Sequence, residues 1–179
     1  MQPSYESPEF DPAVQAFSRD LLAMIDDAFL HEIQQAGLEA MVRLTGSRHG
    51  YFFVRSAAPA RIRIHNVVAP GANTSPAVQE HDEDLDQTGF WSACLEAAAP
   101  VIRNEPSRCD APLTAGFGTL RRDLAVPVHD DGKIVAVVGV GNRPSDYGPR
   151  DVEFLAELAR RLWRVVLRKR LRDEVDPAG

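Results

Sequence analysis

The spacing of hydrophobic residues predicts two amphipathic helices at the start of the chain. Asp11 and Pro12 are typical of a helix start, because a capping carboxylate precedes a proline at the first helical position. Apolar residues then recur at helical spacing over residues 14–28 and again over residues 29–44. Residues 1–10 contain two prolines and no apolar period, so we expect a disordered lead-in there.

The pattern then changes to the β-branched and aromatic residues that are typical of strands. Residues 51–54 and 62–68 are predicted to pair as a hairpin. Residues 124–129 and 134–140 are predicted to form a second hairpin, because the Asp-Gly pair between them supplies the positive φ angles of a tight turn. The remaining predicted elements are a helix over 88–99, a strand over 100–103, a helix over 149–172, and long loops over 69–87 and 104–118.

This order of elements predicts an α+β domain with helices packed against one antiparallel sheet. A length of 179 residues fits a single domain, which we expect over residues 11–172 with a short tail at 173–179. No apolar run approaches the ~18 residues of a membrane span, and the acidic N-terminus does not resemble a signal peptide. We therefore expect a cytoplasmic protein.

The net charge of −6 is unevenly distributed. Residues 160–172 contain seven of the 20 basic residues and no acidic residue, so the rest of the chain carries 13 basic residues against 26 acidic ones. Such an acidic body argues against nucleic acid as a partner, and we expect neither nucleic acid nor a membrane to be bound.

Few residues offer catalytic or metal-binding chemistry. Cys94 is predicted on the apolar side of a short helix, which favours a buried structural thiol, whereas Cys109 follows Arg108 in a loop and its reactivity is left open. The five histidines are scattered singly, without metal-ligand spacing. We expect no catalytic residue, no metal and no cofactor.

The stretch TLRRDLAVPVHDDGKIVAVVGVGNRPSDY, followed by RDVEFL and LWRVVLRKR, resembles the GAF family of sensory domains. Residues 40–53 and 89–104 match more weakly. The sequence looks most similar to the GAF subgroup found beside bacterial histidine kinases and diguanylate cyclases. The resemblance implies a central antiparallel sheet with the N- and C-terminal helices on one face and the loops of a ligand pocket on the other.

The general GAF motif of asparagine, a basic residue, an aromatic and an aspartate is matched by Asn142, Arg143, Tyr147 and Asp151. Val152 stands where the family has glutamate. The resemblance implies that Arg143 pairs with Asp151 and closes the loop over the last helix. Asp151 would lie in the first turn of that helix, where a carboxylate suits the helix dipole.

By the family's pocket location, we expect six residues to bind the ligand, and Arg121 is a candidate anchor for an anionic one. The alternative is that the aromatic residues belong to the core and that Arg121 pairs with an acid such as Asp123. The six candidates are Phe90, Trp91, Cys94, Leu120, Arg121 and Tyr147.

The resemblance implies a small-molecule-sensing regulatory domain of bacterial signal transduction, such as a two-component system, and not an enzyme. Its ligand is unknown, and a histidine kinase or cyclase is the expected output domain. The alternatives are a cysteine-dependent redox enzyme of the free methionine sulfoxide reductase type and a dimerisation module without ligand. A second apolar row on the last helix, formed by Trp163, Leu167 and Leu171, predicts a homodimer through the terminal helices. The alternative is a monomer in which the N-terminal helix of the same chain covers this row.

Overall fold

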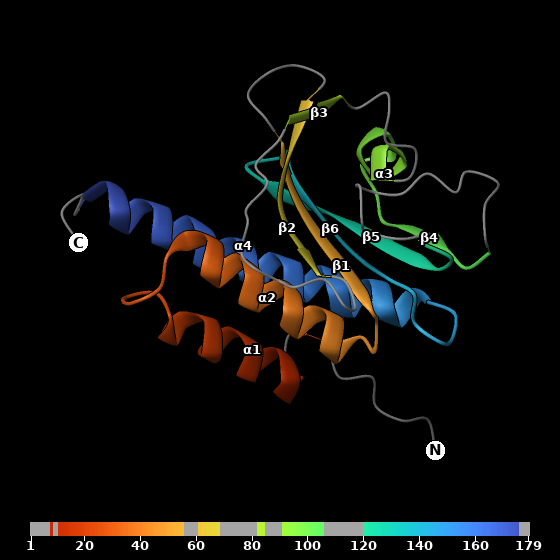
Figure 1. Cartoon of the computed structure of the whole chain (residues 1–179), viewed down its shortest axis with the longest axis horizontal. Coiled ribbons are helices and arrows are strands. Elements are labelled where there is room, and N and C mark those ends of the chain that lie inside the picture. The colour runs from red at the N-terminus through yellow and green to blue at the C-terminus, as the bar shows by residue number, and fades with distance from the viewer. Residues whose placement is uncertain are drawn as a thin grey trace.

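The computed structural model describes residue 8 and residues 11–55, 61–68, 82–84, 91–105 and 120–175. Phe90, Cys109 and most of the two predicted long loops lie outside the described residues, as does nearly all of the predicted lead-in. The elements along the chain (Figure 1) are α1 (Pro12–Ala23), α2 (Leu30–Leu44), β1 (His49–Arg55), β2 (Arg61–Val68), β3 (Asp82–Asp84), α3 (Trp91–Ala97), β4 (Val101–Arg103), β5 (Asp123–Asp130), β6 (Lys133–Gly141) and α4 (Pro149–Val175).

The strands form one antiparallel sheet in the order β3-β2-β1-β6-β5-β4. β1 pairs with β2 on one side and with β6 on the other, so the first strand lies inside the sheet. The turn between β5 and β6 places Asp131 and Gly132 at φ angles of 49° and 74°, which favour Asp and Gly over other residues. Both predicted hairpins are therefore confirmed.

Three helices cover one face of this sheet, and α3 lies on the other (Figure 1). α2 packs over β1 and β2, α4 packs over β5, and α1 lies outside them against both helices. The predicted fold class, an α+β domain with its terminal helices on one face of an antiparallel sheet, is confirmed. Within the described ranges, no helix combines the length and the apolar character needed to cross a membrane.

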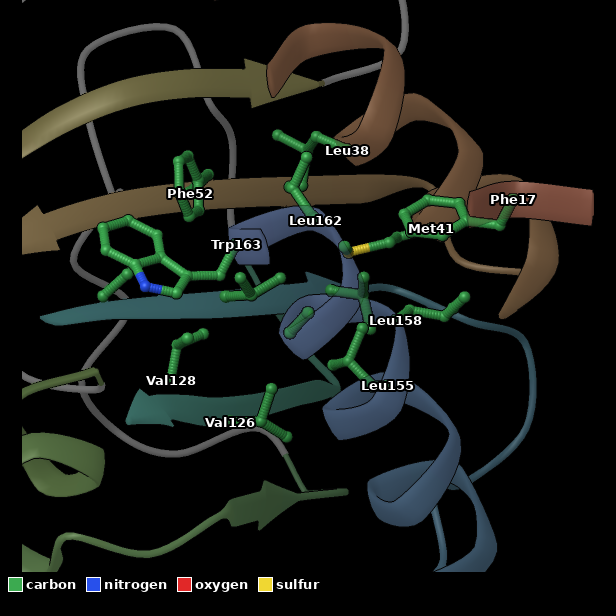
Figure 2. Close-up of a cluster of buried hydrophobic side chains, with 14 of the residues drawn as sticks. Phe17, Leu38, Met41, Phe52, Val126, Val128, Leu155, Leu158, Leu162 and Trp163 are labelled. Atoms are coloured by element: carbon green, nitrogen blue, oxygen red, sulfur yellow. The ribbon is translucent and has the colours of Figure 1, made fainter. Parts of the chain in front are cut away.

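The apolar core lies between the sheet and this helix layer (Figure 2). Leu158 of α4 is fully buried there, and burying a leucine side chain stabilises a fold by about 1.5–3 kcal/mol. The core draws on both strands and helices, with Phe52, Val126 and Val128 from the sheet and Phe17, Leu38, Met41, Leu155, Leu158, Leu162 and Trp163 from the helices.

The first helix is shorter than the spacing predicts, ending at Ala23 rather than at residue 28. Residues 24–28 form a turn in which the Ala28 N–H donates to the Met24 carbonyl at 2.9 Å. Ile25 is only 6% exposed. The apolar residues after Ala23 are therefore buried in the turn that leads into α2, and they do not continue the helix.

The loop predicted over residues 69–87 is corrected in one part, because β3 lies within it. β3 pairs with β2 at the edge of the sheet, with Arg61 opposite Asp84 and Arg63 opposite Asp82. Its acidic sequence resembles a solvated loop, whereas charged residues are also a common feature of edge strands. Pairing between distant segments made it a strand.

The prediction that Trp163, Leu167 and Leu171 form a row free for a partner is wrong for Trp163. This side chain is 6% exposed, and its Nε1–H donates to Asp130 Oδ2 at 3.3 Å, next to the β5–β6 turn. Leu167 is half-buried, and Leu171 is 64% exposed. Because α4 packs against both the sheet and α1, the fold itself covers more than one stripe of this helix.

Candidate functional site

A second set of buried residues lies on the face of the sheet that α3 covers. Side chains alternate along a strand, so Phe52 joins the core beneath the helices while Tyr51 and Phe53 point to the opposite face. These two rings are 0–1% exposed and stack with centroids 4.9 Å apart. Both faces of β1 are therefore buried, one against the helix layer and the other on the side that α3 covers.

Polar groups meet on this face. The Tyr51 hydroxyl donates to the Asp123 carboxylate, at 3.2 Å and 3.3 Å from its two oxygens. Arg103 of β4 approaches the same carboxylate, with Nη2 3.9 Å from Oδ2. Asp123 is fully buried at the start of β5.

Burial shapes the protonation of this group. Loss of hydration raises the pKa of Asp123 well above its ordinary value, while Arg103 and the Tyr51 hydroxyl act in the opposite direction. Burial, and then the neighbouring Asp123, also raise the pKa of Tyr51. The site therefore holds a tyrosine hydroxyl and a carboxyl group that both favour their neutral forms.

Gly139 makes room for the Tyr51 ring. A Cβ atom at this position of β6 would lie 1.9 Å from Tyr51 Cζ, closer than any side chain tolerates. Tyr51 and Gly139 are opposite each other in the β1–β6 pairing. The glycine is thus what allows a large polar aromatic ring to lie flat over the middle of the sheet.

Cys94 of α3 lies next to this group. Its side chain is fully buried, and its thiol is free of any disulfide. Burial, with the nearby Asp123, raises the thiol pKa to about 12. A thiol with such a pKa is not a nucleophile near neutral pH. The predicted burial of Cys94 is confirmed.

Of the six predicted ligand-binding residues, the four whose side chains the structure describes lie in different places. Cys94 lies in this buried group, Trp91 is the first residue of α3, and Phe90 lies outside the described residues. Leu120 is half-buried beside β6, since a Cβ on Gly141 would lie 2.6 Å from its Cδ2.

Tyr147 belongs instead to the apolar core on the helix side. Its hydroxyl lies 2.7 Å from Ser47 Oγ, and its backbone N–H donates to Asn104 Oδ1 at 2.8 Å. The Asn104 amide donates back to the Tyr147 carbonyl at 3.0 Å. These bonds fasten the loop between β6 and α4, which is a structural role.

Arg121 is exposed and lies at the end of the sheet. It does not form the alternative pair with Asp123, whose carboxylate faces Tyr51 and Arg103. Arg121 lines a separate cavity of about 370 Å³. The other residues that line it are Arg48, His49, Arg122, Asn142, Arg143 and Pro144.

The motif residues form the predicted link to the last helix. Arg143 pairs with Asp151 through two bonds, Nη1 to Oδ1 at 2.6 Å and Nη2 to Oδ2 at 2.8 Å. The Gly148 N–H donates to Asp151 Oδ2 at 2.7 Å, which caps the start of α4. Hydrogen bonds from Arg143 lower the pKa of Asp151. The ion pair expected from the motif is confirmed.

Asn142 holds the strand end in an unusual conformation. Its φ of 56° is left-handed, a region that asparagine tolerates better than most residues. Its side-chain oxygen accepts from the Arg121 N–H at 2.8 Å, and its Nδ2 lies 3.1 Å from His49 Nδ1. Asn142 thereby joins the ends of β1, β5 and β6.

The sequence reasoning missed Tyr51, Phe53 and Arg103, and it considered Asp123 only as a partner of Arg121. One signal was available: Asp123 is an isolated acid at the start of an apolar strand, where a carboxylate needs a partner once it is buried. Among the residues that the structure describes, no group of three or more His, Cys, Asp or Glu side chains is placed to hold a metal ion.

The sheet, with three helices on one face and a buried polar group under a short helix on the other, defines a small α+β domain. The family model for the GAF domain matches residues 27–166. The chain belongs to the GAF domain family.

Individual relatives agree with this membership. The methyl sulfide methyltransferase-associated sensor of Methanosarcina acetivorans is 31% identical over 152 residues, which are 82% of this chain. The match covers only 15% of that sensor, so the chain corresponds to a small part of its length.

Solved structures agree in fold. A GAF domain from a phosphoenolpyruvate-protein phosphotransferase of Coxiella burnetii has a TM-score of 0.69 at 12% identity, over 92% of this chain and 99% of that one. The free methionine-R-sulfoxide reductase of Neisseria meningitidis has a TM-score of 0.65 at 11% identity, over 96% and 97%. At these identities the likeness establishes the fold alone.

Proposed function

We propose that this GAF domain is a small-molecule sensor of signal transduction, without catalytic activity, whose ligand binds on the α3 face of the sheet. The observation that carries the proposal is the buried pair of Tyr51 and Asp123, with the half-buried Arg103 beside it. An apolar core already stabilises the opposite face, and a buried carboxyl group costs free energy unless its partners compensate for lost hydration. Perturbed groups of this kind are concentrated at functional sites.

The chemistry of this face favours a ligand with a polar, uncharged or cationic part. Tyr51 offers a hydroxyl, and Asp123 offers a carboxyl group that donates a hydrogen bond when protonated and accepts hydrogen bonds in either form. Phe53 beside Tyr51 offers an aromatic surface. A ligand that places a hydrogen-bonding group between Asp123 and Arg103 would replace their long 3.9 Å contact with shorter bonds.

β5 provides a route from this face to the C-terminal helix. Asp123 points to the α3 face, whereas Val126 and Val128 of the same strand pack beneath α4. The Arg143–Asp151 pair connects the end of β6 to the first turn of α4. A ligand that favours one position of β5 would therefore also favour one position of α4.

Other observations support a sensor rather than an enzyme. The relative from Methanosarcina acetivorans is described as a sensor, and the raised pKa of Cys94 keeps its thiol protonated. We extend the proposal to a bacterial chain with a histidine kinase or cyclase as output domain, dimerised through the terminal helices. A free thiol at Cys94 fits the reducing cytoplasm.

The test begins with the purified protein. Native mass spectrometry detects any co-purified small molecule, and a thermal-shift screen of metabolites identifies compounds that stabilise the fold. Asp123→Asn keeps the size of the side chain but removes its acid, so a ligand of this face should lose most of its stabilising effect. The matched control is Asp20→Asn, on the exposed surface of α1. A ligand that stabilises both variants equally would place the site elsewhere.

The enzyme alternative has its own assay. Free methionine sulfoxide is incubated with the protein and a thiol reductant, and the methionine formed is measured. We expect no turnover above the rate without protein. Turnover that is lost in Cys109→Ser would instead support the redox enzyme, since Cys94 is protonated and buried.

A further inference from the structure

The cavity at the end of the sheet carries an excess of positive charge. Four arginines line it, Arg48, Arg121, Arg122 and Arg143, together with His49. It lies where β1 begins and β6 ends, since His49 pairs with Gly141 there and the Arg48 N–H donates to the Gly141 carbonyl at 2.9 Å. Segments distant in the sequence bring these arginines together.

Two of the four arginines are already engaged. Arg143 is held by Asp151, and its Nη2 also donates to the Asp146 carbonyl. Arg122 pairs with Asp146 through Nε and Oδ1 at 2.8 Å. These bonds hold two guanidinium groups in place at the rim of the cavity and account for both nearby aspartates.

The other two arginines remain available. Arg48 and Arg121 are exposed, and within the described part of the chain neither forms an ion pair with an acidic side chain. Among the described residues at this cavity, four arginines face two aspartates, which leaves a local excess of two positive charges. An anion with two or more negative charges would balance this excess.

The cavity also has a built polar wall. Asn142 holds the Arg121 backbone through its side-chain oxygen and approaches His49 Nδ1 with its amide. Burial, and then the charge of Arg48, lower the pKa of His49. The imidazole therefore favours its neutral form and does not add to the repulsion among the arginines.

We propose that this cavity is a second binding site, which takes a small anion bearing a phosphate group. Arginine forks match the oxygens of phosphate and bind them through paired, charge-assisted hydrogen bonds. A volume of about 370 Å³ suits a small molecule. The cavity shares no lining residue with the Tyr51–Asp123 group, so the proposal stands apart from the sensor function proposed above.

The test uses the full chain and inorganic pyrophosphate as the probe, at constant ionic strength. The assigned ring resonance of His49 is followed by NMR, with the exposed His129 as an internal reference far along β5. We expect the His49 resonance to shift with saturation and that of His129 to remain unchanged. An unshifted His49 at about 10 mM pyrophosphate, a concentration at which even weak complexes form, would overturn the proposal.

Paired variants separate a site from general attraction. Arg48→Ala/Arg121→Ala removes the two available arginines, and we expect pyrophosphate affinity to fall at least about tenfold. The matched control is Arg164→Ala/Arg168→Ala, which removes two exposed charges from α4 and should bind as the wild type does. Equal loss of pyrophosphate affinity in both double variants would show that the anion is attracted by the general positive charge of the protein, and it would overturn the assignment of a site. Citrate binding as tightly as pyrophosphate would contradict the phosphate assignment.

Discussion

Tyr51 and Phe52 are neighbours in β1, and both are fully buried, yet their surroundings differ. Phe52 belongs to the apolar core between the sheet and the helix layer (Figure 2). Tyr51 meets a carboxyl group, an aromatic ring and a glycine on the face beneath α3. One strand thus contributes buried side chains to both faces of the sheet.

The two faces of the sheet differ in what they contribute: one supplies most of the stability, and the other holds the buried polar groups. The helix face contains interlocking Leu, Val, Phe and Trp side chains, whose burial is the main favourable contribution to folding. The α3 face contains groups that are costly to bury, such as Asp123. The helix face supports the fold so that the other face can hold a polar group.

The largest effect is expected on the helix face. Leu158→Ala removes a fully buried side chain from the core and should lower the free energy of unfolding by about 2–5 kcal/mol. Urea unfolding followed by circular dichroism measures the loss. Leu22→Ala, at a residue 39% exposed on α1, is the control and should cost much less. A loss below that of the control would overturn the assignment of this face as the core.

On the α3 face, Gly139→Ala should destabilise the fold by about 1–3 kcal/mol, because the new methyl group collides with the Tyr51 ring. The same unfolding measurement detects it. Tyr51→Leu in the same chain removes the ring and should make the double variant more stable than the sum of the two single losses predicts. Additive losses would show that the collision is not the cause.

The pH dependence of stability distinguishes the faces further. Because burial raises the folded-state pKa of Asp123, the folded state keeps this proton to a higher pH than the unfolded state does. The contribution of this group therefore decreases as the pH rises from about 4, the ordinary aspartate value, through the raised pKa. Asp123→Asn should remove that decrease. The free energy of unfolding of the variant should therefore rise relative to that of the wild type as the pH rises. A parallel pH profile for the two proteins would contradict the raised pKa.

The ion pair at the end of the sheet behaves in the opposite sense. The folded-state pKa of Asp151 is lowered, so its stabilising contribution is present above the unfolded pKa and is lost as the pH falls through the folded one. The two side chains are only 16% and 27% exposed, and we expect a coupling energy of about 1 kcal/mol at neutral pH. A double-mutant cycle of Arg143→Ala and Asp151→Ala measures it, and zero coupling would show that the pair does not stabilise the loop.

The smallest effect on the single chain concerns the outer side of the helix layer. If the terminal helices dimerise, light scattering after size-exclusion chromatography should give twice the chain mass of 19.7 kDa. Leu171→Glu, at a 64% exposed residue, should give a monomer with an unfolding free energy within about 0.5 kcal/mol of the wild type. Trp163→Glu is unsuitable, because Trp163 is buried in its own chain. A wild-type mass of 19.7 kDa would end the dimer proposal.

Much of the fold followed from local patterns. The Asp-Gly turn predicted the β5–β6 hairpin, and helical spacing predicted α2 and α4 with small differences at their ends. Local spacing failed at α1, where the apolar residues after Ala23 lie in a buried turn, and at β3, whose acidic residues gave no sign of pairing. At β3, pairing with β2 decided the conformation, and after Ala23 the buried apolar residue Ile25 lies in a turn with local hydrogen bonds.

The candidate site was less accessible to prediction. Arg143 and Asp151 lie eight residues apart, and a motif that short is visible in the sequence, so their pair was found. Tyr51, Arg103 and Asp123 come from three strands whose order in the sheet is not their order in the chain. Tyr147, Arg121 and Cys94 were grouped by the expected pocket location, and the fold separates them.

The sequence by itself determined the α+β class, the two hairpins, the long C-terminal helix and the Arg143–Asp151 link, because each depends on residues close together in the chain or on a recognisable motif. Only the tertiary structure decided which face of β1 each aromatic ring occupies, that Asp123 meets Tyr51 and Arg103, and that four arginines converge at one end of the sheet. The physical reason is that burial and charge compensation depend on which distant segments come together, and strand order, rather than local pattern, sets those neighbours.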